Sequence, residues 1–133
     1  MKVEPAFRVL VVEDEPMIAM VVEDSIETLG FEIVGPVAQR DEALALAKAG
    51  AFDCAILDVN IRGGNSYDVA ELLLSRGCPF VLATGYSDWS IPQHLVGEKR
   101  LAKPFSSRQI EEELRLMHER VQALRQTPTG NGR

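Results

Sequence analysis

The sequence predicts an α/β fold in which a five-stranded parallel sheet is covered by helices on both faces. Two observations lead to this prediction: short apolar runs recur along the chain, and segments with helical spacing lie between them. A strand–helix unit used repeatedly gives a parallel sheet, because each crossover returns the chain to the same end of the sheet. The 133 residues fit one domain, since domains commonly contain about 100–150 residues.

Five short apolar runs, each of four residues or fewer, are expected to form the strands. In chain order they are Val9–Val12, Phe31–Val34, Cys54–Leu57, Phe80–Ala83 and a weaker run at Leu101–Ala102. Runs of this kind, without a regular polar alternation, are typical of strands that are buried on both faces.

Three helices are expected between these strands, each with a start signal, an apolar face and a glycine stop. The start signals are Pro16, which suits a first helical turn, and the candidate caps Asp41 and Ser66. The stops are Gly30, Gly50 and Gly77. The apolar faces consist of Ile18, Val22, Ile26 and Leu29 in the first helix, Leu44 and Ala47 in the second, and Val69, Leu72 and Leu73 in the third.

The last helix has the clearest signature. Ser106 and Gln109 form a capping box, and the core-facing stripe that follows consists of Ile110, Leu114, Met117, Val121 and Leu124. We favour a core-facing helix over a partner-binding groove for this stripe. Residues 126–133 are rich in Pro, Gly and Asn, so we expect a folded domain over residues 1–125 and a disordered tail.

Composition and charge exclude several functions. The formal net charge of -6 argues against a nucleic-acid surface, which needs clustered Lys and Arg. No apolar run approaches the roughly 20 residues of a membrane span, and the acidic start is unlike a signal peptide. Cys54 and Cys78 lack CxxC spacing, so buried free thiols are favoured over a disulfide or a metal site. We therefore expect a cytoplasmic protein that signals to another protein, without an appended DNA-binding domain.

Charged and polar side chains follow four of the five predicted strands. They are Glu13, Asp14 and Glu15 after the first, Asp58 and Asn60 after the third, Thr84 after the fourth, and Lys103 after the fifth. Because ligand sites in parallel sheets lie at the carboxyl ends of the strands, we expect these side chains to converge. Clustered carboxylates suit Mg²⁺ or Mn²⁺, and a carboxylate nucleophile can form an aspartyl phosphate. Metal, ammonium and hydroxyl groups would neutralise the transferred phosphoryl charge.

Each of these signals has an ordinary explanation when taken alone. An acidic pair before a helix is favourable to the helix dipole, a Thr–Gly pair is usually a turn, and a Lys–Pro pair is usually a solvated loop. Because these signals occur together, in order and at successive strand ends, we favour a metal-assisted phosphoryl site over these separate explanations.

The motifs VLVVEDE, AILDVNI, LATGY and LAKPF resemble the receiver domain of two-component response regulators, over roughly residues 7–124. This resemblance implies a flavodoxin-like doubly wound sheet with strand order 2-1-3-4-5. It also implies that Asp58 is the phosphoacceptor, that Lys103 pairs with the phosphoryl group and that Thr84 moves toward it. The implied Mg²⁺ or Mn²⁺ ligands are Asp14, Asp58, Glu13 through water, and the backbone carbonyl of Asn60.

The resemblance also implies partners and a switch. Receivers take phosphate from a histidine kinase or phosphotransfer protein, catalyse their own phosphorylation and dephosphorylation, and act on a downstream protein through a changed β4–α4–β5 surface. They are not otherwise enzymes. The Lys103–Pro104 bond is often cis in this family. The stretch PFVLATGY further resembles an atypical, stand-alone subgroup with a PF-x-FATG-type fourth strand.

Two departures from the family pattern affect the expected switch. Arg100 stands where receivers commonly carry an aromatic residue, and the segment between Thr84 and Lys103 is short, so its helix is expected only near Ile91–Leu95. We therefore expect switching by ordering of residues 85–97, reported by Trp89, and a role for Tyr86 in phosphoryl lifetime.

Three rival functions fit the sequence less well. A haloacid-dehalogenase-like phosphatase would carry a second acid two residues after the nucleophile, where Asn60 stands here. An interaction module that is not phosphorylated usually lacks the Asp, Thr or Lys, and all three are present. A nucleotide-binding protein would need a GxGxxG or GK[ST] loop, and neither occurs.

Overall fold

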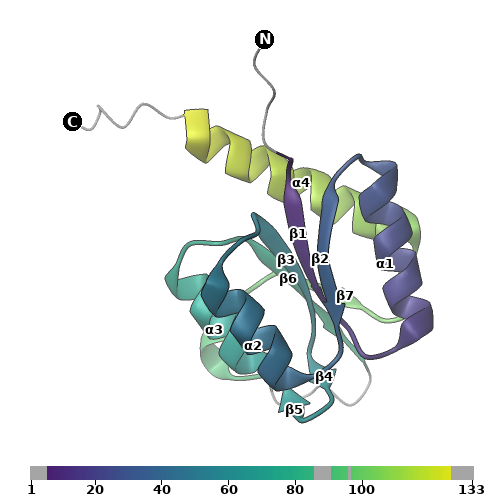
Figure 1. Ribbon diagram of the computed structural model, residues 1–133, viewed down its shortest axis with the longest axis vertical. Helices are drawn as coiled ribbons and strands as arrows, with labels where there is room; N and C mark the ends of the chain where they lie inside the picture. Colours follow the sequence, from purple (N-terminus) through teal and green to yellow (C-terminus); the bar gives the residue numbers. More distant parts are fainter. Residues whose placement is uncertain (1–5, 86–90, 96, 127–133) are drawn as a thin grey trace.

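The computed structural model describes residues 6–85, 91–95 and 97–126, and it has a five-stranded parallel sheet at its centre (Figure 1). The strands are β1 (Arg8–Val12), β2 (Glu32–Val37), β3 (Cys54–Asp58), β6 (Phe80–Thr84) and β7 (Arg100–Ala102). Their order is β2-β1-β3-β6-β7. This order equals the predicted 2-1-3-4-5, because β4 and β5 form a separate hairpin.

The helices form one layer on each side of the sheet. In Figure 1, α1 (Pro16–Thr28) and α4 (Ser107–Gln126) lie on one face, and α2 (Arg40–Ala49) and α3 (Tyr67–Ser75) lie on the other. This confirms the predicted doubly wound architecture. None of the helices in the described part of the chain combines the length and the apolar character needed to cross a bilayer.

Alternating side chains of the central strands enter two separate cores. On β1, Leu10 and Val12 pack toward α2 and α3, whereas Val9 and Val11 pack toward α1 and α4, and all four are 0 % exposed. This explains why the central strands have continuous apolar sequences. Strand β2 is only partly buried, so the predicted burial on both faces is wrong for this strand. It lies at the edge of the sheet, where it pairs with β1 alone.

The helix ends agree with the sequence in part. Ser106 Oγ accepts from Gln109 N–H at 3.1 Å, and Gln109 Oε1 accepts from Ser106 N–H at 2.8 Å, so the capping box is confirmed. The predicted Asp41 cap is wrong, because α2 starts two residues earlier than that cap implies and the Gln39 side chain caps it instead. Ser66 holds the N-cap position of α3 without a side-chain cap bond.

The apolar stripe of α4 is buried only as far as Val121. Leu124 is 61 % exposed, so its predicted core position is wrong. The reason is visible in Figure 1, where the C-terminal end of α4 extends past the strands that it covers. The helix continues to Gln126, the first residue of the predicted tail, and residues 127–133 lie outside the described residues.

A small hairpin follows β3 and was not predicted. It consists of β4 (Asn60–Ile61) and β5 (Gly64–Asn65), joined through Gly63 with a φ of 88°. Two backbone hydrogen bonds attach it to the loop before α2: Arg62 N–H donates to Ala38 O at 3.2 Å, and Arg40 N–H donates to Arg62 O at 2.9 Å. The loop carrying Asn60 is therefore held in place.

In the described part of the segment between β6 and β7, a short 3₁₀ turn forms at Gln93–Leu95, within the predicted range. Ile91 and Leu95 of this segment are buried in the core under α2 and α3. Tyr86 and Trp89, which were assigned roles from the sequence, lie outside the described residues. Cys54 and Cys78 are free thiols, as predicted, but only Cys54 is fully buried and Cys78 is half-buried.

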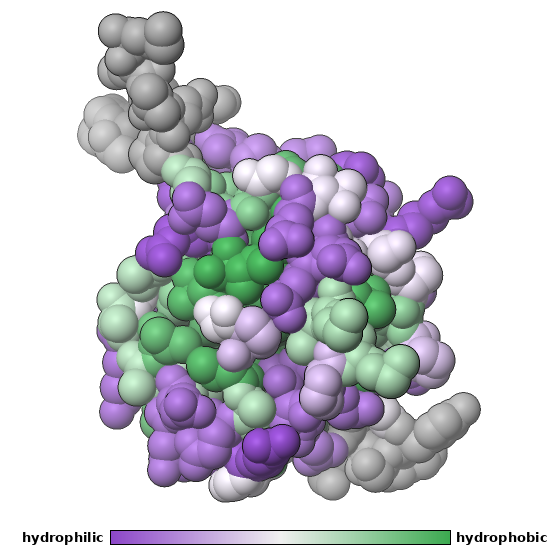
Figure 2. Space-filling view, turned by 45° about the vertical axis from the view of Figure 1, so that its right-hand side comes forward, coloured by the Kyte–Doolittle hydropathy of each residue, from purple (hydrophilic) through white to green (hydrophobic). Residues whose placement is uncertain are grey.

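Figure 2 turns the side with α1 forward and shows separate apolar patches within a largely polar surface. Two large apolar side chains at the start of α1 contribute exposed area: Met17 is 80 % exposed and Met20 is 62 % exposed. Single exposed apolar residues are common, but two on adjacent turns of one helix are available to a partner protein.

Candidate functional site

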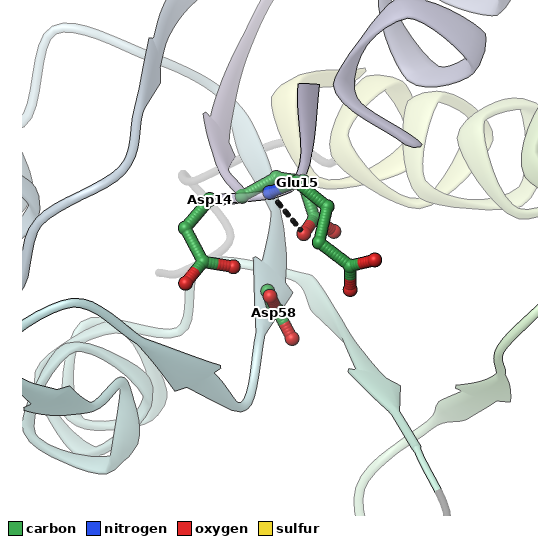
Figure 3. A group of neighbouring side chains, drawn as sticks. Asp14, Glu15 and Asp58 are labelled. Atoms are coloured by element: carbon green, nitrogen blue, oxygen red, sulfur yellow. Dashed lines mark hydrogen bonds between the residues drawn. The ribbon is translucent and has the colours of Figure 1, made fainter. Parts of the chain in front are cut away.

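The carboxyl ends of β1 and β3 bring an acidic cluster together (Figure 3). It consists of Glu13, Asp14, Glu15 and Asp58, each of which offers a carboxylate oxygen within 4.8 Å of the others. The parallel pairing of β1 with β3 produces this arrangement, because it aligns the ends of the two strands. The predicted convergence of these side chains is thus present.

The members of the cluster differ in solvent exposure. Glu13 is 5 % exposed and Asp58 is 3 % exposed, whereas Glu15 is exposed and Asp14 is half-buried. The backbone holds Glu13 inward, since its N–H donates to Val37 O of β2 at 2.9 Å. The Glu13 side chain also accepts from the Glu15 N–H at 3.1 Å, which Figure 3 shows as a dashed line.

Lys103 reaches this cluster from the end of β7. Its ammonium nitrogen lies 3.1 Å from Asp58 Oδ1, 3.1 Å from Glu13 Oε2 and 3.0 Å from Glu15 Oε1. The Lys103 backbone N–H donates to Thr84 O at 2.7 Å, which fixes the start of its loop beside β6. The Lys103–Pro104 bond is cis, in agreement with the family pattern.

The Asp58 carboxyl has a strongly perturbed acidity. Burial, followed by the adjacent Glu13 carboxylate, raises the pKa of Asp58 from 3.8 to about 8 against the opposing effect of Lys103. For Lys103, burial alone lowers the pKa, but the hydrogen bond to Glu15 and the negative charges of Asp58 and Glu13 outweigh it. The pKa of Lys103 therefore lies above its usual value, and the ammonium stays charged.

The donor set fits a hard divalent cation. One oxygen of Asp58, Oδ2, is buried and accepts no hydrogen bond from any residue in the described ranges. A carboxylate oxygen without a hydrogen bond, beside three further carboxylates, is a position where a cation would neutralise negative charge. Mg²⁺ and Mn²⁺ favour such oxygen ligands and retain open positions for water or phosphate oxygens.

Two further predicted site residues, Thr84 and Asn60, lie on other strands. Thr84 ends β6, and its hydroxyl oxygen lies 3.5 Å from Leu101 O as a donor toward β7. Asn60 lies in the hairpin strand β4, two residues after Asp58, and is exposed. Its role as a backbone metal ligand remains a prediction.

Sequence reasoning placed Glu15 at the strand end but assigned it no role. The structure adds it to the contacts of Lys103, and no residue spacing could show this. Arg100 is exposed on β7 and pairs with Leu82 in the sheet register.

The sequence is similar to a known protein family and to individual regulatory proteins. Residues 9–115 match the family model of the response regulator receiver domain. The chain is similar to the transcriptional regulatory protein PdtaR of Mycobacterium tuberculosis, with 33 % identity over 74 % of this chain and 50 % of that protein. It is also similar to the phyllosphere-induced regulator PhyR of Methylorubrum extorquens, with 33 % identity over 75 % of this chain and 39 % of that protein. The chain spans half or less of the length of these relatives.

Among solved structures, the solution structure of SdrG from Sphingomonas melonis Fr1 has 44 % identity and a TM-score of 0.74. That comparison covers 85 % of this chain and 97 % of SdrG. The BeF₃-activated conformation of SdrG, from Pseudomonas melonis Fr1, has 44 % identity, a TM-score of 0.66 and coverage of 84 % and 97 %.

Proposed function

Because the chain belongs to the response regulator receiver domain family of two-component signalling, we propose that Asp58 accepts a phosphoryl group from a histidine kinase or phosphotransfer protein. The observation that supports this most directly is the Asp58 side chain itself. It is buried at the end of β3, has one oxygen without a hydrogen bond within the described residues, and lies 3.1 Å from the Lys103 ammonium. A nucleophile needs such a free oxygen next to a fixed positive charge.

The proposed transfer is a single displacement at phosphorus. One carboxylate oxygen of Asp58 forms the new O–P bond while the P–N bond of the donor phosphohistidine breaks. The electron pair of that bond stays on the donor imidazole, which takes up a proton from solvent. Lys103 contributes a charged hydrogen-bond donor to a phosphoryl oxygen, while Thr84 would reorient its hydroxyl from Leu101 O toward the phosphoryl group.

Glu13, Asp14, Asp58 and the Asn60 carbonyl would hold the divalent cation, with Glu13 acting through water. Mg²⁺ supplies positive charge that offsets the carboxylates and neutralises the phosphoryl oxygens. The same charge favours the ionised form of Asp58, which is the form that attacks. Because the pKa of Asp58 is raised to about 8, the ionised form is disfavoured in the absence of a cation.

The partner that delivers the phosphoryl group would contact the surface around the start of α1. Met17 and Met20 are exposed there, and α1 begins immediately after the acidic residues of the site. We place the protein in the cytoplasm, where such partners act. The downstream partner would read the surface that includes β6 and β7.

The experiment is incubation of the protein with a small phosphodonor and Mg²⁺, followed by intact-mass measurement. We expect the mass of one phosphoryl group on the wild type, none on Asp58→Asn, and one on the control Asp24→Asn, whose carboxylate is exposed on α1. An Asp58→Asn protein that gains the same mass would contradict the assignment. Sustained turnover of a generic phosphate ester would instead favour the phosphatase alternative.

A further inference from the structure

The Lys103 ammonium is fully occupied by carboxylates. An ammonium has three N–H donors, and Lys103 has three partners, Glu13, Glu15 and Asp58, at 3.1, 3.0 and 3.1 Å. Lys103 can therefore donate to a phosphoryl oxygen only if one of these contacts is given up.

The three contacts differ in how much each costs to break. The side chains of Glu13 and Asp58 are 3 % and 4 % exposed, whereas that of Glu15 is 59 % exposed. Water can replace Lys103 as the partner of an exposed carboxylate, but it cannot reach a buried one. The contact with Glu15 is therefore the cheapest of the three to lose.

The backbone does not require the Glu15 side chain to stay beside Lys103. Glu15 is the N-cap residue of α1, yet its carboxylate makes no cap bond to the helix. Its backbone is held independently of the side chain, because its N–H donates to Glu13 Oε2 and its carbonyl accepts from Ala19 N–H at 2.9 Å. In Figure 3 the Glu15 side chain extends away from that of Asp14, at the side of the cluster. It is free to swing into solvent without unwinding the first turn of α1.

We propose that Glu15 is the residue that Lys103 exchanges for the phosphoryl group on Asp58. This inference rests on the proposed function. A phosphoryl oxygen takes the place of Glu15 Oε1, the carboxylate moves into solvent, and the proton count of Lys103 is unchanged. Glu15 is a positioning residue: it holds the ammonium in place before transfer and competes with the phosphoryl group afterwards, which limits how tightly the activated state is held.

The test measures how tightly fluoroberyllate, a phosphoryl mimic, binds at saturating Mg²⁺ to the wild type and to Glu15→Gln. We expect the variant to bind about fivefold more tightly, the size of one exposed ion pair. Glu27→Gln is the matched control, since it removes the same charge from an exposed position on α1. It should bind as the wild type does.

Two further variants separate competition for Lys103 from general repulsion of the anion. Glu15→Asp keeps the charge but shortens the side chain, so it should resemble Glu15→Gln if the contact matters. In a Lys103→Met background the effect of Glu15→Gln should disappear. A Glu15→Asp protein that binds like the wild type, or an effect that persists without Lys103, would overturn the exchange.

The remaining outcomes distinguish this inference from the proposed function. A wild type that binds no fluoroberyllate and gains no phosphoryl mass would overturn the proposed function and the inference together. A competent wild type with an unaffected Glu15→Gln variant overturns the inference alone. The inference alone is also overturned if Glu15→Gln loses Mg²⁺ affinity tenfold or more without tighter fluoroberyllate binding. Glu15 would then be a metal ligand.

Discussion

Replacing Asp58 by Asn should make the metal-free protein more stable, although it removes the proposed phosphoacceptor. Asp58 is buried beside the Glu13 carboxylate, and burial is the largest cause of its raised pKa. A raised carboxyl pKa means that the folded state disfavours the ionised form. Asparagine has nearly the same shape and no charge, so it avoids this penalty.

The size of the effect follows from the pKa. In the unfolded chain the Asp58 carboxyl has a pKa near 3.8, and in the folded protein it has a pKa of about 8. Between 3.8 and neutral pH lie about three pH units, each worth about 1.4 kcal/mol, so the cost approaches ~4 kcal/mol. The opposing effect of Lys103 is already contained in this pKa. We expect Asp58→Asn to be about 2–4 kcal/mol more stable near pH 7.

The pH dependence provides a second signature. Between pH values near 3.8 and 8, the folded state keeps a proton on Asp58 that the unfolded chain has released. The contribution of Asp58 to the free energy of unfolding should therefore fall as pH rises through this window and level off above it. Asp58→Asn should lack this trend, and the difference between the two proteins should shrink toward pH 4.

Urea denaturation in EDTA, repeated at several pH values between about 4 and 9, measures both signatures. Asp24→Asn serves as the control for an exposed carboxylate and should match the wild type. An Asp58→Asn protein that is equally or less stable than the wild type at pH 7.5 would refute the reasoning. Added Mg²⁺ should stabilise the wild type and leave Asp58→Asn nearly unchanged.

Three further predictions concern the cation and two helix ends. Mg²⁺ binding at pH 7 should release close to one proton per ion from Asp58, and calorimetry in buffers of different ionisation enthalpy measures this release. Ser106→Ala should cost about 1 kcal/mol in urea denaturation, because Gln109 N–H loses its acceptor, whereas Ser107→Ala should have little effect. Arg76→Ala should cost about 1 kcal/mol, because the Arg76 guanidinium donates to Ala47 O at 2.7 Å; Arg76→Lys should recover part of it.

The fold could be predicted because its signals are periodic. Apolar runs such as Val9–Val12 place side chains in both cores, and glycine stops such as Gly50, in the left-handed region with φ 70°, end the helices where the sequence indicates. The convergence of the carboxylates with Lys103 was predictable for a similar reason: parallel strands align their carboxyl ends whatever lies between them.

The features that escaped prediction depend on contacts between segments. Nothing in the sequence distinguishes Gln39 from Asp41 as a cap, since the two lie only two residues apart and both carry a suitable side-chain oxygen. The stripe position of Leu124 is correct for a helix face, but a stripe does not say where the sheet beneath it ends. The contact between Glu15 and Lys103 joins residues 88 positions apart, beyond the reach of any local pattern.

The hairpin after β3 has a mechanical consequence. Arg62 is bonded through its backbone to Ala38 and Arg40, on either side of the N-cap of α2. The loop that leaves Asp58 is therefore coupled to a helix on the far side of the sheet from α1. If that loop moves, either the two backbone hydrogen bonds of Arg62 break or the first turn of α2 moves with the loop.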